Sequence, residues 1–468
     1  MRYWTVGLLG LLTGCLGTTH LLNAVHNEVQ SAPMYSAIER HPSMKRSPGP
    51  SRILPDSTAE STAPTVRTDP AVYSDEFWSA VANLDLSGSR EVARTEPEAR
   101  FADAVARLAA GDNEKAESMF GELGTQNTDL NVATGAQMML ATTLLYEHKW
   151  SEARDLLNSL RLDREDRQHI AGIDVWGRVF RNVEPQMTPM PATRVTLPME
   201  ITLVGTPIVR TRINGKEYRF WLDTGSSITV LNSDVAAEAG VSIIAPDTLT
   251  IGTFAGVAPA RPALLKRMEI GSIAMSNIPV IIIDSHLMRV RASSEGVPWS
   301  GLPVDGIIGW DTIRQFDVTL DYENRKITIQ RPESLATRGT PEQNLMWVGR
   351  PLVQVWTKSG ATLHFTLDTG AQTSFISSQV LKKARVTANS SNARPYGIGR
   401  TGGQQAQSVS MLSLNVGGSF FLLRNLIVFD PSSSGLINCD GILGSDLARF
   451  GMIRIDATNG LFSIGVDG

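Results

Sequence analysis

The chain has 468 residues, which is more than one ordinary hydrophobic core accommodates, so we expect two or three domains. With 42% hydrophobic and 19% charged residues, its composition is typical of a soluble globular protein. The formal net charge of −4, without a cluster of lysine and arginine, gives no indication of nucleic-acid binding.

The first 15 residues resemble an export signal. Arg2 gives a basic start, and the apolar run at 6–13 is too short to span a bilayer comfortably. The string LTGC, which ends at Cys15, resembles the lipobox of bacterial lipoproteins. This resemblance implies cleavage before Cys15 and lipidation of its thiol, whereas an ordinary cleaved signal or an uncleaved anchor are the alternatives. We therefore expect an exported, periplasmic protein that a lipid anchor holds at a membrane.

Residues 16–73 are rich in proline, serine, threonine and alanine, and no hydrophobic period survives in them. Such a composition predicts a disordered, fairly extended tether. After a lipid site, it would hold the globular part away from the membrane.

A helical pattern follows in residues 74–183. Thr95 and Glu98 have the spacing of a capping box, with Pro97 in the first turn. This helix is expected to stop at Gly111, and Asp112 to cap the next one. Four apolar positions then recur 37 residues later: Ala104, Leu108, Ala116 and Phe120 as Ala141, Leu145, Ala153 and Leu157.

This recurrence resembles the helical hairpins of tetratricopeptide repeats, although that family repeats at about 34 residues. A generic helical bundle is the alternative. In either case the region would offer a surface for a protein partner or substrate and no chemistry of its own.

Beyond a proline-broken linker at 183–194, short β-branched runs divided by Gly, Asn and Asp predict an all-β region. The region is a tandem repeat. FWLDTGSS, which contains Asp223, recurs as FTLDTGAQ with Asp368, and DGIIGWD at 305–311 recurs as DGILGSD at 440–446. The spacing shortens by eleven residues between Asp284 and Gly306, so the first copy should carry an extra surface loop. We expect an α+β multidomain chain with two β lobes, at 195–333 and 345–467.

Each repeated Asp-Thr-Gly puts a carboxylate on a tight loop after an apolar strand, where Gly225 and Gly370 permit backbone geometry that a side chain would hinder. Two lobes related by a pseudo-twofold axis can bring Asp223 and Asp368 side by side. Neighbouring carboxylates cannot both ionise cheaply, so they share one proton. The charged member can then activate a water while the protonated member polarises a carbonyl, which hydrolyses an amide without metal or cofactor. The alternative is two turn carboxylates in a non-catalytic module.

From about residue 195 to the C-terminus, the sequence resembles the aspartic peptidases, especially the single-chain, retropepsin-like type. The resemblance implies that Asp223 and Asp368 form the catalytic dyad and that Thr224 and Thr369 hydrogen-bond across the lobes. It also implies two glycine-rich flaps that close over a peptide substrate. The candidate flap residues are Ile251, Gly252, Thr253 and Phe254 in the first lobe and Ile398, Gly399, Arg400 and Thr401 in the second. The first hairpin has no tyrosine, unlike the pepsin-like group, which favours the retropepsin-like type.

The two catalytic loops differ at one position, Ser226 against Ala371. We hypothesise that the Ser226 hydroxyl hydrogen-bonds the Asp223 carboxylate and favours its charged form. Asp311 and Asp446 each precede a short helical string and are expected to cap it.

Other motifs are weaker. GIGRTG at 397–402 fits the dinucleotide pattern Gly-x-Gly-x-x-Gly, but a strand-like pattern follows where a helix should open, which favours the flap. The seven histidines have no metal-ligand spacing. The sequence therefore predicts an aspartic endopeptidase whose helical repeats recruit a substrate or partner. The alternative function is a non-catalytic peptide-binding or scaffold protein on the same fold.

Overall fold

A computed structural model describes residues 76–125, 129–160, 173–202, 205–245, 249–253, 256–290, 302–333, 343–390, 396–397, 400–401, 407–416, 419–430 and 436–465. The predicted signal, Cys15 and the tether lie outside these residues. Within the described part of the chain, no helix is long and apolar enough to cross a membrane.

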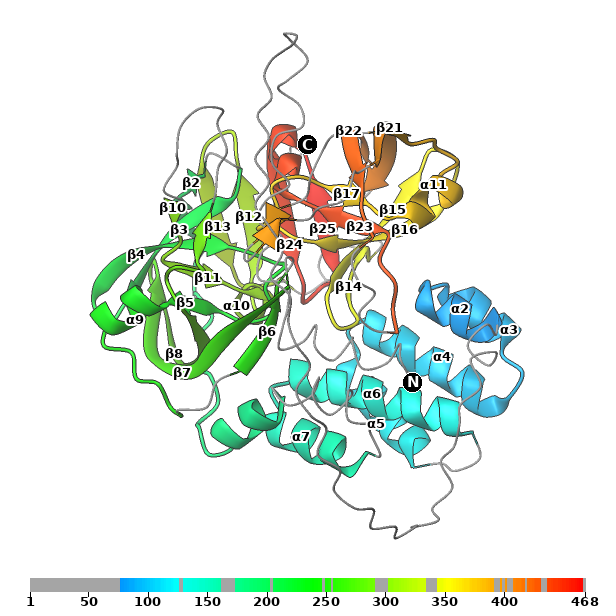
Figure 1. Ribbon diagram of the computed structural model, residues 1–468, viewed down its shortest axis with the longest axis horizontal. Helices are drawn as coiled ribbons and strands as arrows, with labels where there is room; N and C mark the ends of the chain where they lie inside the picture. The colour runs from blue at the N-terminus through cyan, green and yellow to red at the C-terminus, as the bar shows by residue number, and fades with distance from the viewer. Residues whose placement is uncertain are drawn as a thin grey trace, which may run out of the picture.

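The N-terminal region is helical (Figure 1). Its helices are α2 (Glu76–Ala82), α3 (Leu86–Val92), α4 (Glu96–Ala109), α5 (Asn113–Gly124), α6 (Leu130–Tyr146) and α7 (Trp150–Ser159), and residues 173–179 are also helical. The capping box predicted for α4 is present, with Thr95 accepting from the Glu98 amide and Glu98 accepting from the Thr95 amide. Asp112 stands at the N-cap of α5 but makes no side-chain cap bond.

The 37-residue recurrence marks the packed faces of these helices. All eight positions that it links are buried, and the four alanines are fully buried. Alanine lets neighbouring helices approach closely, and α4, α5, α6 and α7 pack in sequence, each against the next. The structure thus shows a stack of helices, and the closer likeness to tetratricopeptide repeats stays a prediction.

Two eight-stranded sheets with the same strand order form the lobes. The first sheet runs β2 (Glu200–Ile201), β3 (Pro207–Ile213), β4 (Lys216–Leu222), β11 (Gly306–Ile308), β5 (Val230–Asn232), β8 (Ile273–Ile283), β7 (Gly256–Ile270), β6 (Leu249–Thr253). The second runs β14 (Leu345–Trp347), β15 (Pro351–Thr357), β16 (Thr362–Leu367), β23 (Gly441–Leu443), β17 (Phe375–Ile376), β22 (Ser419–Val428), β21 (Gln407–Val416), β18 (Asn389–Ser390).

Each sheet folds back on itself, because β3 also pairs with β7 and β15 with β21. Short helices occupy equivalent places in the two lobes. They are α9 (Ser233–Glu238) and α10 (Trp310–Ile313) in the first, and α11 (Ser378–Lys383) and the 3-10 helix η3 (Ser445–Phe450) in the second. The extra segment of the first lobe contains a pair of short strands, β9 (Arg289–Val290) and β10 (Leu302–Pro303). The predicted helical region with a two-lobed β region is confirmed.

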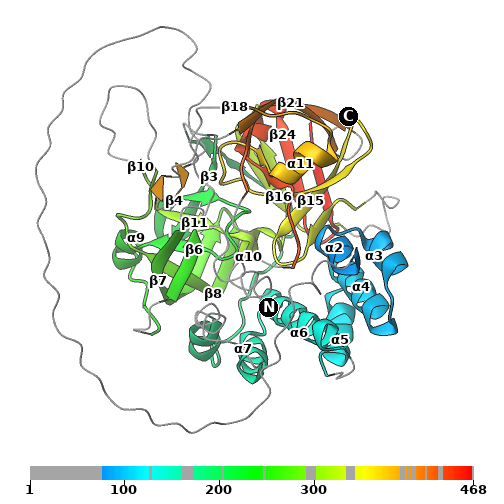
Figure 2. The same cartoon turned by 45° about the vertical axis from the view of Figure 1, so that its right-hand side comes forward.

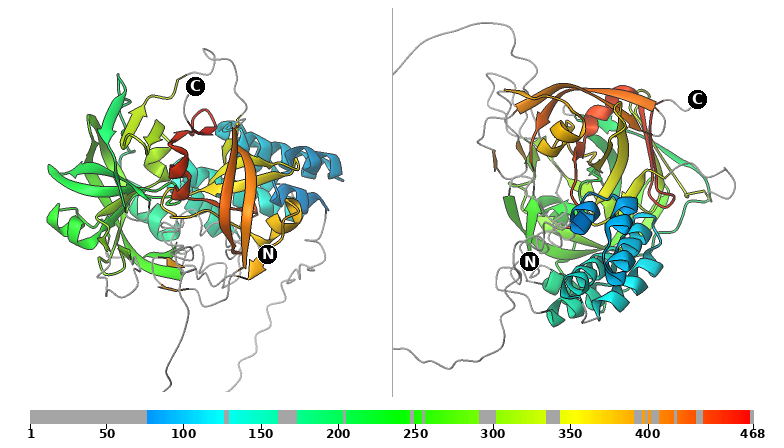
Figure 3. Two further views of the ribbon diagram at one scale, coloured as in Figure 1. Left: turned by 90° about the horizontal axis from the view of Figure 1, so that it is seen from above. Right: turned by 90° about the vertical axis from the view of Figure 1, so that its right-hand side faces the viewer.

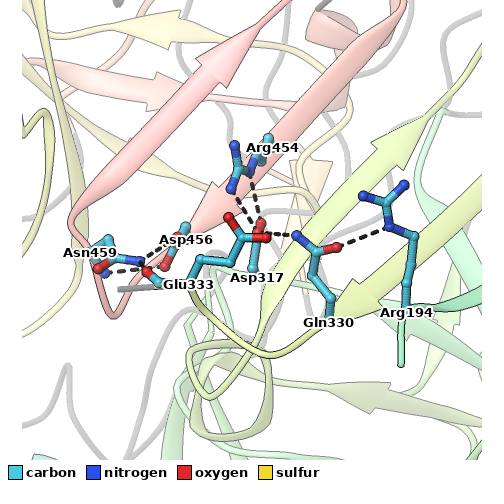
Figure 4. A network of polar contacts seen from close by, with 7 residues as sticks. All are labelled: Arg194, Asp317, Gln330, Glu333, Arg454, Asp456 and Asn459. Atoms are coloured by element: carbon cyan, nitrogen blue, oxygen red, sulfur yellow. Dashed lines mark hydrogen bonds and ion pairs between the residues drawn. The ribbon is translucent and has the colours of Figure 1, made fainter. Parts of the chain in front are cut away.

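A five-stranded sheet joins the lobes. Its order is β1 (Val195–Pro198), β13 (Lys326–Gln330), β12 (Asp317–Asp321), β24 (Met452–Asp456), β25 (Leu461–Ile464), so the lobes meet at the β12–β24 pair. Arg454 on β24 makes two hydrogen bonds, of 2.9 and 2.7 Å, to the fully buried carboxylate of Asp317 on β12 (Figure 4). Gln330 donates a further bond of 2.6 Å to Asp317.

The helical region packs against both lobes (Figures 2 and 3). On the second lobe, the Asn438 amide donates to the Ala82 carbonyl at 2.7 Å, and Tyr146 stacks on Trp347. On the first lobe, Arg314 donates to the Tyr146 carbonyl. The end of α6 therefore contacts the two lobes at once.

Candidate active site

The two Asp-Thr-Gly loops lie where strands of the two lobes end. Asp223 follows β4 and its amide donates to the Ile308 carbonyl at 3.0 Å, while Asp368 follows β16 and its amide donates to the Leu443 carbonyl at 3.0 Å. In each lobe the strand before the aspartate pairs in parallel with an apolar strand, β11 or β23. The repeated segments at 305–311 and 440–446, which contain β11 and β23, thus bond directly to the two loops.

Asp223 and Asp368 are brought together, and both are fully buried. Burial raises the pKa of Asp223 well above its ordinary value, and the charge and hydrogen bonding of the adjacent Asp368 carboxyl raise it further. Backbone amides act in the opposite direction: Gly225 donates to Asp223 at 2.9 Å. On the other loop, Gly370 and Ala371 donate to Asp368 at 3.0 and 2.8 Å. The two carboxyls can therefore share one proton, and the backbone amides of both loops stabilise the negative charge that remains.

Thr224 and Thr369 hydrogen-bond across the lobes. The Thr224 hydroxyl donates to the Leu367 carbonyl at 2.8 Å and accepts from the Thr369 amide at 3.0 Å. The Thr369 hydroxyl donates to the Leu222 carbonyl at 2.7 Å and accepts from the Thr224 amide at 3.1 Å. Four buried bonds therefore fix one loop against the other, and with them the relative position of the carboxyls.

Glycine is needed at positions 225 and 370 because a side chain would not fit there, and not because of the backbone conformation. Neither has a positive φ. A Cβ added at Gly225 would lie 2.4 Å from the Asp368 Cγ, and one added at Gly370 would lie 2.4 Å from the Asp223 Cγ. Each glycine thus makes room for the carboxyl of the opposite lobe, which corrects the reason expected from the sequence.

The hypothesis for Ser226 is wrong in this structure. Its hydroxyl donates to the Ile228 carbonyl at 2.7 Å, so its one proton is not available to Asp223. The backbone amide of Ser226 instead acts on Asp223 and lowers its pKa. Ala371 has the equivalent place in the other loop, where its amide donates to Asp368.

In each lobe a further pair of side chains supports the loop, and the sequence motifs did not predict these two pairs. Thr229 donates to Asp311 at 3.0 Å, and Ser374 donates to Asp446 at 2.6 Å. The same hydroxyls accept from Gly309 and Gly444, which are the N-cap residues of α10 and η3. Asp311 and Asp446 therefore lie in the first helical turn and not at the cap. Thr229 and Ser374 are hydroxyl residues 145 positions apart, and this recurrence in the sequence could have predicted their common role.

Asp311, in the single turn of α10, is also a buried carboxyl. Burial raises the pKa of Asp311 to about 6, and the hydrogen bonds from Thr229 oppose that rise. Because Asp311 accepts a hydrogen bond from Thr229, it supports the Asp223 loop.

The candidate flaps are only partly described. In the first, β6 and β7 form an antiparallel hairpin in which Ile251 pairs with Ala258, Gly252 with Val257 and Thr253 with Gly256, whereas Phe254 lies outside the described residues. In the second, β19 (Tyr396–Gly397) and β20 (Arg400–Thr401) pair as an antiparallel hairpin around Ile398 and Gly399, which lie outside the description. A dinucleotide-binding loop would open a helix at this place.

No group of three or more His, Cys, Asp or Glu side chains that could hold a metal ion occurs among the residues that the structure describes. The two-carboxyl arrangement itself provides an acid and a base.

Comparisons with known proteins agree with this arrangement. A family model described as Aspartyl protease matches residues 209–312 and 353–447, one block in each lobe. The comparison with curated proteins gave no match. One similar solved structure is the crystal structure of aspartic proteinase from Irpex lacteus, with 14% sequence identity and a TM-score of 0.37, covering 58% of this chain and 97% of that chain. The family match, with one block in each lobe, supports an aspartic-peptidase-like fold and aspartic peptidase activity in general.

Proposed function

We propose that the protein is an aspartic endopeptidase of the single-chain, retropepsin-like type, with Asp223 and Asp368 as its catalytic dyad. The observation that carries the proposal is a pair of fully buried carboxyls, one from each lobe. Backbone amides donate to each of them, and equivalent threonine hydrogen bonds fix the two loops against each other. The lack of a tyrosine in the first hairpin supports the retropepsin-like type.

The geometry supports a proton-shuttling mechanism. The charged carboxylate takes a proton from a water, whose oxygen attacks the peptide carbonyl carbon, while the protonated carboxyl gives its proton to the carbonyl oxygen. When the C–N bond of the tetrahedral intermediate breaks, the leaving nitrogen receives the proton that the first carboxylate took, and one hydroxyl of the intermediate returns its proton to the second carboxylate, which restores the starting pair. The raised pKa of Asp223 keeps a proton on the pair at a pH where an isolated carboxyl has lost it.

The dyad is tested by Asp223→Asn and Asp368→Asn. Each variant loses either the base or the shared proton, so we expect the cleavage rate of peptides in a library to fall by at least about 10³-fold. Cleavage is measured by mass spectrometry from acidic to neutral pH. The matched control is Asp284→Asn, because Asp284 is half-exposed on the same lobe as Asp223 and pairs with Arg261 at 3.4 Å. Full activity in both dyad variants would exclude the mechanism.

A wild-type protein that binds peptides but cleaves none over this pH range would instead support the peptide-binding alternative. In that case Asp223→Asn should leave peptide affinity within about twofold, since binding a peptide does not require the proton transfer.

We also propose that Cys15 carries a lipid and that the helical region recruits substrate or partner at the membrane. The LTGC string supports the first part, and the stacked helices support the second. Cys15→Ala should move the protein from the membrane fraction to the soluble periplasmic fraction, as measured by fractionation and intact mass. Unchanged membrane association, with an intact mass that lacks a lipid, would contradict the anchor.

A further inference from the structure

The end of α6 is joined to the first lobe through Arg314, the C-cap residue of α10. Arg314 Nη2 donates to the Tyr146 carbonyl at 2.5 Å and lies 3.1 Å from His148 Nε2. Its guanidinium carbon lies 3.7 Å from the centroid of the Tyr146 ring, which is a cation–π distance. Burial and then the charge of Arg314 lower the pKa of His148 to about 3, so His148 stays neutral beside the guanidinium.

The second lobe contacts the same ring. Trp347 of β14 stacks on Tyr146 with 3.8 Å between ring centroids and 28° between ring planes. Two groups this close to one centroid cannot share a face of the ring. Tyr146 therefore lies between Arg314 of the first lobe and Trp347 of the second lobe.

The other end of α10 is bonded to the Asp223 loop. The Trp310 amide donates to the Ser226 carbonyl at 2.6 Å, and Thr229 donates to Asp311 at 3.0 Å. A Cβ on Gly309 would lie 2.6 Å from the Ile228 backbone, so the loop and the start of α10 are in contact. Since α10 is a single turn of four residues and the Arg314 amide donates to the Trp310 carbonyl at 3.0 Å, the backbone at Arg314 is bonded directly to the residue that contacts the loop.

A cavity of about 50 Å³ lies beside this junction. Its lining includes Tyr146, Ile228, Trp310 and Arg314. Packing on this side of the Asp223 loop is therefore incomplete, and the loop has room to shift when a supporting contact is lost.

We propose that Tyr146 and Arg314 are positioning residues through which the helical region holds α10, and through α10 the Asp223 loop, in its working geometry. The proposal rests on the proposed peptidase function. It makes the helical region part of the catalytic assembly, because removing the ring would loosen one carboxyl relative to the other.

The test compares Tyr146→Leu with Tyr146→Phe. Leucine removes the ring that both lobes contact, whereas phenylalanine keeps the ring, and the hydrogen bond from Arg314 goes to the backbone carbonyl in either case. A displacement of about 1 Å can cost about 10²-fold in rate, so we expect a partial displacement to lower kcat of Tyr146→Leu about tenfold with KM within about twofold. Tyr146→Phe should keep kcat within about twofold of the wild type.

Backbone hydrogen exchange provides a readout that does not depend on activity. Exchange of the amides at 223–229 should be about tenfold faster in Tyr146→Leu and unchanged in Tyr146→Phe, even if the Asp223→Asn test rejects the peptidase function. Wild-type exchange and kcat in a folded Tyr146→Leu variant would overturn the proposal, as would equal acceleration throughout the chain. Should Tyr146→Leu not fold, Arg314→Gln takes its place, with the same changes expected.

Discussion

At the scale of single residues, the two glycines of the Asp-Thr-Gly loops set the distance between the carboxyls. Gly225→Ala and Gly370→Ala would each place a methyl group 2.4 Å from the Cγ of the opposite aspartate. Since neither backbone has a positive φ, the chain should still fold while the carboxyls move apart. We expect a loss of kcat of about 10²-fold or more, measured on a peptide substrate.

Gly121→Ala is the matched control for these substitutions. Gly121 lies in α5, and a Cβ there would meet nothing within 4 Å. The alanine should leave kcat unchanged and raise the free energy of unfolding by up to about 1 kcal/mol. Equal activity of Gly225→Ala and Gly121→Ala would show that the carboxyls tolerate the added methyl group.

The residue scale also shows what the sequence could predict. Asp223, Asp368 and the threonines that follow them were predictable because the Asp-Thr-Gly motif occurs twice in equivalent places of the repeat. The role of Ser226 was not, because its single hydroxyl proton had two acceptors to choose from, and the Ile228 carbonyl takes it. The Arg314–Tyr146 contact was not predictable either, since it joins residues 168 positions apart and occurs in no repeat.

At the scale of elements, the contact between β12 and β24 determines how firmly the lobes are joined. Among the side chains that the structure describes, Arg454→Met would leave the fully buried Asp317 carboxylate only its bond from Gln330. We expect the free energy of unfolding to fall by about 2–3 kcal/mol, below the usual cost of breaking a buried pair because the Arg454 side chain is 22% exposed. Denaturant unfolding measures the change.

The control for this prediction is Arg212→Met, which breaks an ion pair whose arginine is 53% exposed. Exposed pairs contribute about 0–1 kcal/mol, so this variant should be close to the wild type. If both arginine variants lose the same stability, the Asp317–Arg454 pair does not brace the lobes.

At the scale of the whole molecule, acid should weaken the contact between the helical region and the lobes. The pKa of His148 is about 3 in the folded chain, against an ordinary value of 6.5. Between these values the unfolded chain binds a proton that the folded chain does not, so this contribution to stability is present above pH 6.5 and is lost progressively toward pH 3. Between pH 7 and pH 5, we expect the free energy of unfolding of His148→Gln to fall by about 2 kcal/mol less than that of the wild type.

Thermal or denaturant unfolding at pH 7 and pH 5 measures this difference. His286→Gln serves as the control, because His286 is exposed on the first lobe. If His148→Gln and the wild type lose the same stability between the two pH values, the buried histidine is not the acid-sensitive group.

The order of the domains was predictable at this scale, because the helical and strand periods differ and the β repeat is complete. The way the domains pack was not predictable. Tyr146 and Trp347 belong to no motif, and their stacking depends on how the helical region meets the second lobe.

The register of β12 against β24 has a consequence for how far the two halves can diverge. Thr319 lies directly opposite Arg454, and the two are equivalent positions of the repeat, 135 residues apart. In a symmetric pair of C-terminal halves, Arg454 would face its own copy on the axis, and like charges directly opposite destabilise a sheet. Joining unlike halves in one chain puts threonine there instead, while the guanidinium turns to Asp317. The single chain can therefore place an arginine at the pseudo-twofold axis between β12 and β24, where a homodimer of the C-terminal half would bring two arginines into repulsion.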